Sequence, residues 1–254
     1  MKIAVCIKQV PSREGQPRLT EDRTWVREQD ASFEMNEPDQ YAVEAALRLK
    51  EQYGGEVIAC SAGPARVTQV IREALARGAD RAIHVEDDRL ASADASVVAE
   101  ALASAMRDEG FDLVLAGLQS DDMGFGQMGV MLAERLGMPH ATIIMDVQIS
   151  DGGVRVKREL EGGWFQWVSM PLPALLTIQS GINQVRYATL KGIMAAKKKE
   201  IRRVPAPPGL AATQRMLGLY VPEKTKHTEI IAGPPAEAAR ELIRRLRDEA
   251  RVLS

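Results

Sequence analysis

The chain has 254 residues, of which 45% are hydrophobic and 27% are charged. Such a chain can bury a large core, as one large domain or two smaller ones, and its composition excludes wholesale disorder. Lysine and arginine number 33 against 35 aspartate and glutamate, so no cationic excess supports sequence-independent binding of nucleic acid.

The sequence also argues against a membrane protein and against a structural metal. No apolar run approaches the roughly 18 residues of a membrane-spanning helix, and the opening MKIAVCIKQVP becomes polar too soon for a signal peptide. Cys6 and Cys60 lie in apolar runs, and two cysteines at this spacing fit neither a disulfide framework nor a zinc site. We therefore expect a cytoplasmic protein that does not insert into membranes and binds no metal.

The first half of the chain alternates between strand-like and helix-like patterns. Four short apolar runs predict buried strands, at residues 3–7, 57–60, 82–85 and 113–116. Apolar stripes at helical spacing predict the helices between and after them, at about 42–53, 67–75, 97–105 and 130–136. Asn36 looks like the N-cap of the first helix, and a glycine follows each stripe. This alternation predicts an α/β fold with a doubly wound, mostly parallel, Rossmann-like sheet.

The second half begins with a different pattern. Three alternating runs predict antiparallel strands, at residues 142–149, 154–160 and 164–170. Two acidic-glycine-glycine turns separate them, and residues 173–178 return to a buried run. We therefore expect an antiparallel insertion in the parallel sheet.

The last quarter shows little regular pattern before a final helix. Residues 180–194 look irregular, and the basic run 197–203 is either a docking patch or, more commonly, a solvated face. A stiff proline segment at 205–209 leads to a charged helix at 235–252 with a thin apolar stripe. We divide the chain into an α/β nucleotide-binding domain at 1–204, with antiparallel strands at about 141–170 and a loop at about 183–200, and a linker and C-terminal arm at 205–254. The helix either docks on a partner or is a loosely packed terminus.

Ligands of open parallel sheets bind beyond the carboxyl ends of the strands, so the loops after the strands are the candidate sites. The loop at 117–129, after the fourth strand, contains G-x-G-x-x-G at Gly124, Gly126 and Gly129, with Asp146 further on. Such glycines let backbone amides approach a phosphate at a helix N-terminus. The dinucleotide fingerprint normally follows the first strand, so an adenine nucleotide is favoured over NAD and over a turn without a ligand.

Catalytic patterns are missing from the sequence. The three histidines are scattered, no serine lies in a nucleophile elbow, and H-E-x-x-H and C-x-x-C are absent. A nucleotide-binding fold without such groups indicates a carrier or a subunit of a complex rather than an enzyme.

Several motifs in order resemble one family. They are VCIKQVP at 5–11, Met35-Asn36 leading into AVEAALRLK at 42–50, GADRAIHV at 78–85, VKRELEGG at 156–163 followed by Gln166, Val168 and PALLT at 173–177, and RYATL at 186–190 with IMAAKKK at 193–199. With these motifs, the chain resembles the β subunit of an electron transfer flavoprotein, of the bacterial or archaeal type, up to the proline segment.

The resemblance implies a heterodimer with an α subunit that holds most of the redox FAD at the interface. It implies that this chain binds AMP, or a second FAD as in electron-bifurcating members, and that the complex carries electrons between flavin dehydrogenases and a quinone oxidoreductase. The family's nucleotide contacts fall by position on Cys6, Asn36, Glu37, Pro38, Asp39, Ala62, Gly63, Gly117, Gln119, Ser120, Asp121, Asp122, Gly124, Phe125, Gly126, Gln127, Met128 and Gly129. Docking to partner dehydrogenases falls on Tyr187, Leu190, Ile193 and Met194, with Leu190 as the anchor.

The loop SDDMGFGQMG at 120–129 matches neither the AMP-binding nor the bifurcating pattern, so both nucleotides stay open. Two other classes of protein share this type of sheet. A universal-stress-like module that binds ATP or AMP would be a homodimer without the segment at 186–199, and a nicotinamide dehydrogenase domain would need a polar site for hydride transfer.

Overall fold

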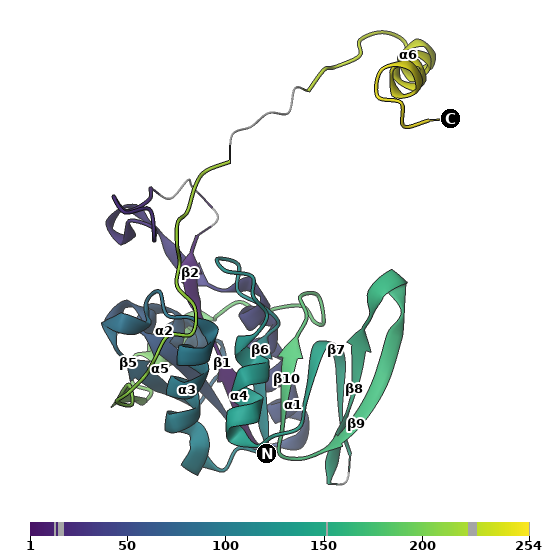
Figure 1. Cartoon of the computed structure of the whole chain (residues 1–254). Coiled ribbons are helices and arrows are strands. Elements are labelled where there is room, and N and C mark those ends of the chain that lie inside the picture. Colours follow the sequence, from purple (N-terminus) through teal and green to yellow (C-terminus); the bar gives the residue numbers. More distant parts are fainter. Residues whose placement is uncertain (13, 15–17, 151, 223–227, 254) are drawn as a thin grey trace. The chain divides into compact units, whose positions relative to one another are not determined.

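The computed structural model describes the whole chain except residues 13, 15–17, 151, 223–227 and 254. It divides the chain into two compact units, Met1–Leu219 and Tyr220–Ser254. The first unit is an α/β structure built on one large sheet (Figure 1). It includes the proline-rich segment at 205–209, at which the sequence pattern suggests a linker.

The large sheet has nine strands in the order β11-β5-β4-β1-β6-β10-β7-β8-β9. In chain order the strands are β1 (Lys2–Cys6), β4 (Glu56–Gly63), β5 (Arg81–Glu86), β6 (Leu113–Gly117), β7 (His140–Ser150), β8 (Gly153–Glu159), β9 (Phe165–Pro171), β10 (Ala174–Ile178) and β11 (Ile201–Pro205). Pairing is parallel from β11 to β7 and antiparallel from β7 to β9. The chain builds outward from β1 in both directions, through β4 and then through β6. This confirms the doubly wound sheet and places its switch point between β1 and β6.

Helices cover both faces of the parallel part (Figure 1). The α-helices of the first unit are α1 (Glu37–Tyr53), α2 (Thr68–Arg77), α3 (Ala95–Met106), α4 (Met128–Leu136) and α5 (Leu190–Ala196). Single 3₁₀ turns are η1 (Glu28–Asp30), η2 (Ala65–Val67), η3 (Asp88–Leu90), η4 (Arg107–Glu109) and η5 (Glu161–Gly163). Ile3 and Val5 pack into the core with α1 and α2, whereas Ala4 and Cys6 pack into the core with α3 and α4. Because alternate side chains point to opposite faces, β1 is buried on both sides, as its apolar run predicts.

The antiparallel insertion is present, and a sharp irregularity begins it. The register of β7 shifts between Ile144 and Asp146, and Ile143 has a φ of 61°, which is unusual for a β-branched residue. Beyond this bulge, β7 pairs antiparallel with β8, and β8 pairs antiparallel with β9. The three strands therefore extend the parallel sheet on one side only.

Four elements were not expected from the sequence pattern. A small antiparallel sheet joins β2 (Gln9–Pro11) to β3 (Phe33–Met35). The prediction of an irregular segment at 180–194 is wrong from Leu190 onward, because α5 begins there, with the Thr189 hydroxyl accepting a hydrogen bond from Gly192 N at 3.0 Å. The basic run ends in β11, where Arg202 pairs with Glu109 at 2.6 Å, so it is not simply a solvated face.

Residues 206–214 form a strap on the first unit, in which Ala206 and Leu210 pack against the core and Asp94 holds the end. Asp94 is 7% exposed, and its Oδ2 accepts hydrogen bonds from Thr213 N at 2.5 Å and Gln214 N at 2.7 Å. Its Oδ1 caps α3 by accepting from Val97 N at 2.8 Å. Burial acts to raise the pKa of Asp94, but these hydrogen bonds outweigh it and lower the pKa.

Replacing Asp94 by serine is expected to free the strap while leaving α3 capped, because a serine hydroxyl can accept from Val97 N but cannot also reach the strap. A hydrogen bond to a charged group contributes about 1.5–3 kcal/mol, so amide exchange at Thr213 and Gln214 should become roughly 10- to 100-fold faster. Asp88→Asn is the control, since Asp88 is exposed on the neighbouring turn. Unchanged exchange at both amides in the serine variant would show that Asp94 does not hold the strap.

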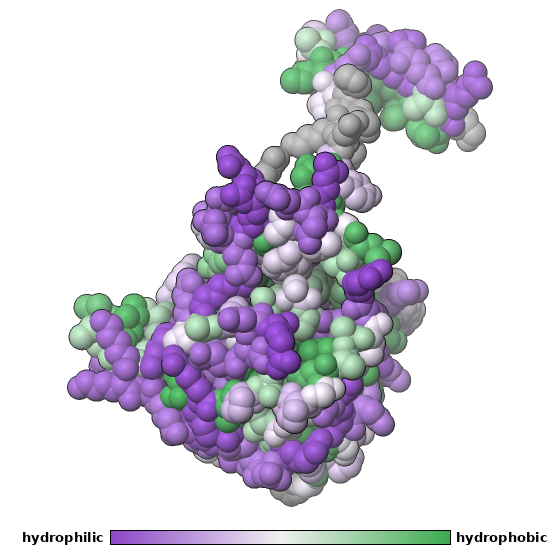
Figure 2. Space-filling model, turned by 60° about the vertical axis from the view of Figure 1, so that its left-hand side comes forward, coloured by the Kyte–Doolittle hydropathy of each residue, from purple (hydrophilic) through white to green (hydrophobic). Residues whose placement is uncertain are grey.

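The second unit contains α6 (Pro235–Asp248), in which Leu242 and Ile243 remain about half exposed. Figure 2 shows a mostly hydrophilic surface on the visible face of the molecule, with hydrophobic residues in small separate groups. None of the described helices is long and apolar enough to cross a membrane.

Candidate functional site

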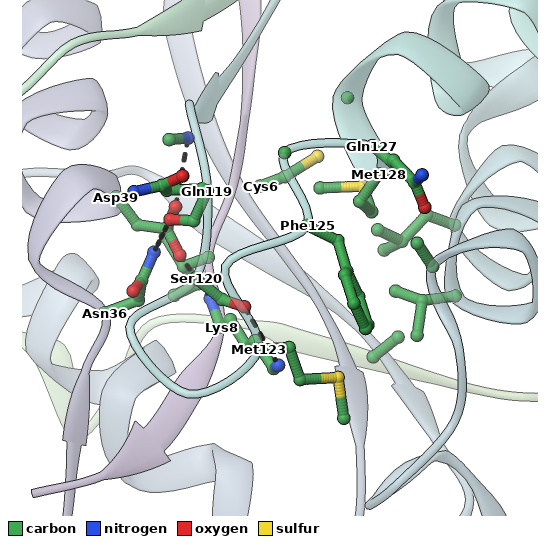
Figure 3. A pocket seen from close by; sticks show the side chains of 18 of the residues that line it. Cys6, Lys8, Asn36, Asp39, Gln119, Ser120, Met123, Phe125, Gln127 and Met128 are labelled. Carbon is green, nitrogen blue, oxygen red and sulfur yellow. Dashed lines mark hydrogen bonds between the residues drawn. The ribbon is translucent and has the colours of Figure 1, made fainter. Parts of the chain in front are cut away.

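A cavity lies in the first unit at the carboxyl ends of β1, β4 and β6, at the switch point of the sheet (Figure 3). This is where the doubly wound topology places ligands. The residues that line it are Cys6, Ile7, Lys8, Asn36, Asp39, Ala62, Leu90, Ala91, Ala93, Ala95, Val98, Leu102, Gly117, Leu118, Gln119, Ser120, Met123, Phe125, Gly126, Gln127, Met128 and Gly129.

Most of the residues expected to contact a nucleotide come together in this lining. Twelve of them line the cavity: Cys6, Asn36, Asp39, Ala62, Gly117, Gln119, Ser120, Phe125, Gly126, Gln127, Met128 and Gly129. Six others are not in the lining: Glu37, Pro38, Gly63, Asp121, Asp122 and Gly124. Asp146, considered as a ribose contact, lies on β7 and also does not line the cavity.

Asp39 ties helix α1 to the ends of the two central strands. Its Oδ2 accepts from Lys8 N at 2.7 Å, just after β1, and its Oδ1 accepts from Gly117 N at 3.0 Å, at the end of β6. A Cβ at Gly117 would lie 2.3 Å from Asp39 Oδ1, so only glycine permits this approach. Asp39 is 5% exposed, and burial raises its pKa to about 7 although the hydrogen bonds act in the opposite direction.

Asn36 occupies the N-cap position of α1, as the sequence predicts, but its side chain makes no capping bond and instead fixes the loop after β6. Its Nδ2 donates to Gln119 O at 3.0 Å, and its Oδ1 accepts from Asp121 N at 2.9 Å. The loop returns the contact, because Asp121 Oδ2 accepts from Glu37 N at 3.1 Å in the first turn of α1. A carboxylate of the loop after β6 thus satisfies an amide at the start of α1 that the side chain of Asn36 leaves uncapped.

Lys8 adds a third connection to the same loop. Its Nζ lies 2.7 Å from Asp122 Oδ1, and the Asp122 side chain is largely buried. In Figure 3 the Lys8, Asn36 and Asp39 side chains lie on one side of the loop, whereas Phe125 and Gln127 lie on the other. The charged and amide groups on the first side are bonded within the protein, so they shape the loop and are not all free for a ligand.

The start of α4 is the group of donors best suited to an anion. Gln127, which precedes the helix, makes no side-chain capping bond, so the first amides of α4 receive no acceptor from it. Gly126 has a φ of 63°, a left-handed conformation that glycine adopts without strain and that brings bare backbone to the cavity. An uncapped helix N-terminus with backbone N–H groups exposed in a cavity suits a phosphate.

Gly129 lines the cavity and also allows close packing. A Cβ there would lie 2.5 Å from Thr177 Cγ2 on β10. The third glycine of the G-x-G-x-x-G pattern therefore brings α4 close to the sheet, while Gly126 shapes the loop above it.

An apolar wall faces the loop across the cavity, and the sequence pattern did not predict it. It comes from the turn after β5, the residues that follow this turn, and α3, with Leu90, Ala91, Ala93, Ala95, Val98 and Leu102. Small apolar side chains of this kind leave room for a planar base. The signal was available, because residues 90–95 follow the third predicted strand, whose carboxyl end meets the same edge of the sheet.

The two cysteine thiols of the chain are unsuited to nucleophilic catalysis. Burial raises the pKa of the Cys6 thiol well above its usual value and that of Cys60 to about 12, so neither is a thiolate near neutral pH. Buried His84 bonds Gly63 O through Nε2 at 3.0 Å, and burial lowers its pKa. Among the described residues, no cluster of histidine, cysteine, aspartate and glutamate could hold a metal ion.

The four residues expected to dock on partners lie outside the cavity lining. Tyr187 is 95% exposed and Leu190 is 78% exposed, and Ile193 and Met194 on α5 are also exposed. A Cβ on Gly192 would lie 2.3 Å from Ala76 O, so this glycine lets α5 pack directly on α2.

A buried carboxylate supports the segment that carries these side chains. Glu44 on α1 accepts from Arg186 Nε at 2.7 Å and from Arg48 Nε at 2.6 Å. Burial acts to raise the pKa of Glu44, but the two guanidinium groups outweigh it and lower the pKa. The bonds to Glu44 therefore fix the backbone segment that precedes these exposed apolar side chains.

The chain matches known proteins over most of its length. The model of the electron transfer flavoprotein domain matches residues 24–208. The chain is 39% identical to the electron transfer flavoprotein subunit beta of Methylophilus methylotrophus, over 96% of this chain and 97% of that protein. It is 36% identical to the Bacillus subtilis subunit beta, over 90% and 91% of the two chains, and 39% identical to the mitochondrial subunit beta of Oryza sativa subsp. indica over the full length of both. The resemblance seen in the sequence motifs is thus confirmed, and the chain belongs to the electron transfer flavoprotein family, among relatives that are beta subunits.

Proposed function

We propose that this chain is the β subunit of a heterodimeric electron transfer flavoprotein in the cytoplasm. In this proposal the chain binds an adenine nucleotide in its own cavity and, with an α subunit, holds the FAD of the complex. The complex carries electrons between flavin dehydrogenases and a quinone oxidoreductase. Bound FAD supplies the redox chemistry, and the chain itself is a carrier subunit and not an enzyme.

The observation that supports the nucleotide most strongly is the pairing of two unlike surfaces across one cavity. The N-terminus of α4, where the N-cap side chain makes no capping bond, offers backbone amides for a phosphate, and Leu90, Ala91 and Val98 offer an apolar surface for a base. AMP and the adenosine monophosphate part of a second FAD share these two groups, so the cavity suits either nucleotide.

Three side chains hold the loop after β6 in a fixed conformation. Asn36, Asp39 and Lys8 hold residues 117–122 from behind, so the glycines beyond them meet the nucleotide in a fixed conformation. Preorganisation of this kind reduces the entropy lost on binding. The anchoring residues act on the ligand through the loop that they hold.

Replacing Leu190 by alanine is expected to slow electron transfer with partner dehydrogenases by about 10- to 100-fold in kcat/KM. Burying a leucine side chain contributes about 1.5–3 kcal/mol, and the 78% exposure of Leu190 means that the free chain gains little from it. Flavin content and thermal stability should therefore stay unchanged. Ala195→Ser, at another exposed position of α5, is the control. Loss of flavin in Leu190→Ala would mean that the residue is structural instead.

Co-expression with an α subunit followed by a visible spectrum tests the proposed function as a whole. A yellow heterodimer that dehydrogenases reduce is the expected result. A colourless homodimer would contradict it in favour of a universal-stress-like module, and NADH-dependent turnover by the isolated chain would contradict it in favour of a dehydrogenase.

A further inference from the structure

The exposed side chains expected to dock on partners lie on one short stretch of chain, residues 187–194, which we call the docking segment. They are Tyr187, Leu190, Ile193 and Met194. Side chains as exposed as Tyr187 and Leu190, at 95% and 78%, make few contacts of their own with the rest of the chain. The position of the docking segment therefore depends on its backbone and on the residues on either side of it.

One face of α1 holds the chain just before the docking segment. Polar groups that recur at helical spacing along this face reach residues 183–186. The Tyr41 carbonyl accepts from Asn183 Nδ2 at 3.0 Å, and Arg48 Nη2 donates to Gln184 O at 3.0 Å. The partners of these two bonds lie 142 and 136 positions apart in the sequence, so the fold and not the loop alone determines them.

The most extensive contact of this face joins Glu44 to Arg186. The Glu44 side chain is only 3% exposed. Its Oε2 accepts from Arg186 N at 3.3 Å and from Arg186 Nε at 2.7 Å, and its Oε1 accepts from Arg186 Nη2 at 3.1 Å. Arg186 Nη2 also donates to Glu51 Oε2 at 3.1 Å. One buried carboxylate thus binds both the backbone and the guanidinium fork of the residue that directly precedes Tyr187.

A second arginine, Arg72 on α2, holds the chain just after the docking segment. Its Nη1 donates to Ala196 O and, at 2.8 Å, to Lys199 O. The Lys199 ammonium in turn donates to Leu75 O at 3.0 Å, near the end of α2. Helices α1 and α2 pack into the same part of the core. The docking segment therefore runs from one fixed helix to another and is bound to each of them.

We propose that Glu44 is a positioning residue for docking, and that its bonds to Arg186 present Leu190 to a partner dehydrogenase in the conformation that binds. This proposal rests on the proposed function, which supplies the dehydrogenase. Since Glu44 is buried, it acts through the docking segment without touching the partner. A segment that is fixed before the encounter loses little conformational entropy on binding.

Electron transfer from a flavin dehydrogenase to the purified heterodimer tests this role. Glu44→Gln should raise the KM for the heterodimer about 10-fold and leave kcat unchanged, because the docking segment is less ordered before binding. Arg186→Lys keeps a cation but loses the fork that binds Glu44 and Glu51 together, so it should raise the KM as well. Dithionite needs no docking, and it should reduce the flavin of both variants as fast as that of the wild type.

Glu100→Gln is the matched control for the loss of a carboxylate. Glu100 on α3 pairs with Arg135 on α4 at 2.8 Å, and these helices pack on the other face of the sheet. This variant should therefore keep the KM of the wild type. Thermal unfolding of each variant checks that the fold is intact.

The double variant of Glu44→Gln with Leu190→Ala separates positioning from a general effect on the fold. If Glu44 acts through Leu190, its replacement should raise the KM less than twofold once the leucine side chain is gone, because the two effects are then not additive. Effects that add in full would overturn the proposal.

The remaining outcomes distinguish this proposal from the proposed function. If no flavin dehydrogenase reduces the wild-type heterodimer, the proposed function fails. If the wild type is reduced and Glu44→Gln has the same KM, the positioning proposal alone fails. Loss of flavin or slower reduction by dithionite in Glu44→Gln would also overturn it, because Glu44 would then act on the flavin site and not on docking.

Discussion

Gly126→Val is expected to empty the cavity of its nucleotide, with an affinity at least about 100-fold lower than that of the wild type. Gly126 lines the cavity with a φ of 63°, and a β-branched residue in this conformation is strained by about 1–3 kcal/mol. Either the strain moves the loop before α4 or the valine methyl groups occupy space that the ligand needs. Acid extraction and chromatography of the purified chain measure the nucleotide content.

Gly137→Val is the matched control for this substitution. Gly137 ends α4 with a φ of 65°, nothing lies within 4 Å of a Cβ there, and it does not line the cavity. It should destabilise the fold by a similar amount and keep the nucleotide. Equal nucleotide content in the two variants would count against the site. It would mean that a valine in the cavity lining affects nucleotide binding no more than a valine outside it.

The second large effect concerns pH and the buried carboxyl group of Asp39. Burial raises its pKa to about 7 from the ordinary value of 3.8. Between these two values the unfolded chain has already lost the proton that the folded chain keeps, so the free energy of unfolding falls as the pH rises. The full loss corresponds to about 4 kcal/mol. Asp39→Asn carries no proton to lose, and the stability of the wild type relative to this variant should fall by that amount between pH 4 and pH 8.

Urea unfolding of both proteins at several pH values measures this difference. The asparagine variant is the reference for all other titrating groups, because they are common to the two chains. A difference that stays constant or grows with pH would mean that the Lys8 and Gly117 amides stabilise the Asp39 carboxylate enough to cancel the effect of burial. The carboxylate would then strengthen the fold at neutral pH instead of weakening it.

The parallel sheet was predictable because its signals are local. Strands buried on both faces need continuous apolar runs, and the runs at 3–7 and 113–116 correspond to β1 and β6. Glycines with positive φ at 54, 78 and 137 end helices where the stripes end. Each of these features depends on neighbours in the sequence.

The elements that were missed depend on distant contacts. Helix α5 has seven residues and an exposed apolar surface, so it has no amphipathic stripe to reveal it. Strand β11 has the sequence IRRVP, with two arginines and one proline among five residues, yet it pairs along its whole length with β5, with Arg203 opposite His84 and beside Glu86. Residues that lie about 120 positions apart supply these contacts, and the local pattern cannot show them.

In the candidate site, too, the features with local signals were predictable and those that depend on distant contacts were not. The loop at 117–129 was found from its glycines and from its place after a strand. The N-cap position of Asn36 was predictable, but its side-chain bond with Asp121 N was not, because that partner lies 85 positions away. The apolar wall at Leu90 to Val98 becomes part of the site only when β5 is placed two strands from β1.

Counting the nucleotides in the purified heterodimer tests the central claim most directly, that this chain has a nucleotide site of its own in addition to the shared flavin. The account predicts one FAD and one further adenine nucleotide, AMP or a second FAD, in each complex of one β and one α subunit. A complex with a single FAD and no other adenine nucleotide would contradict it, because the cavity between α4 and the apolar wall would then hold nothing.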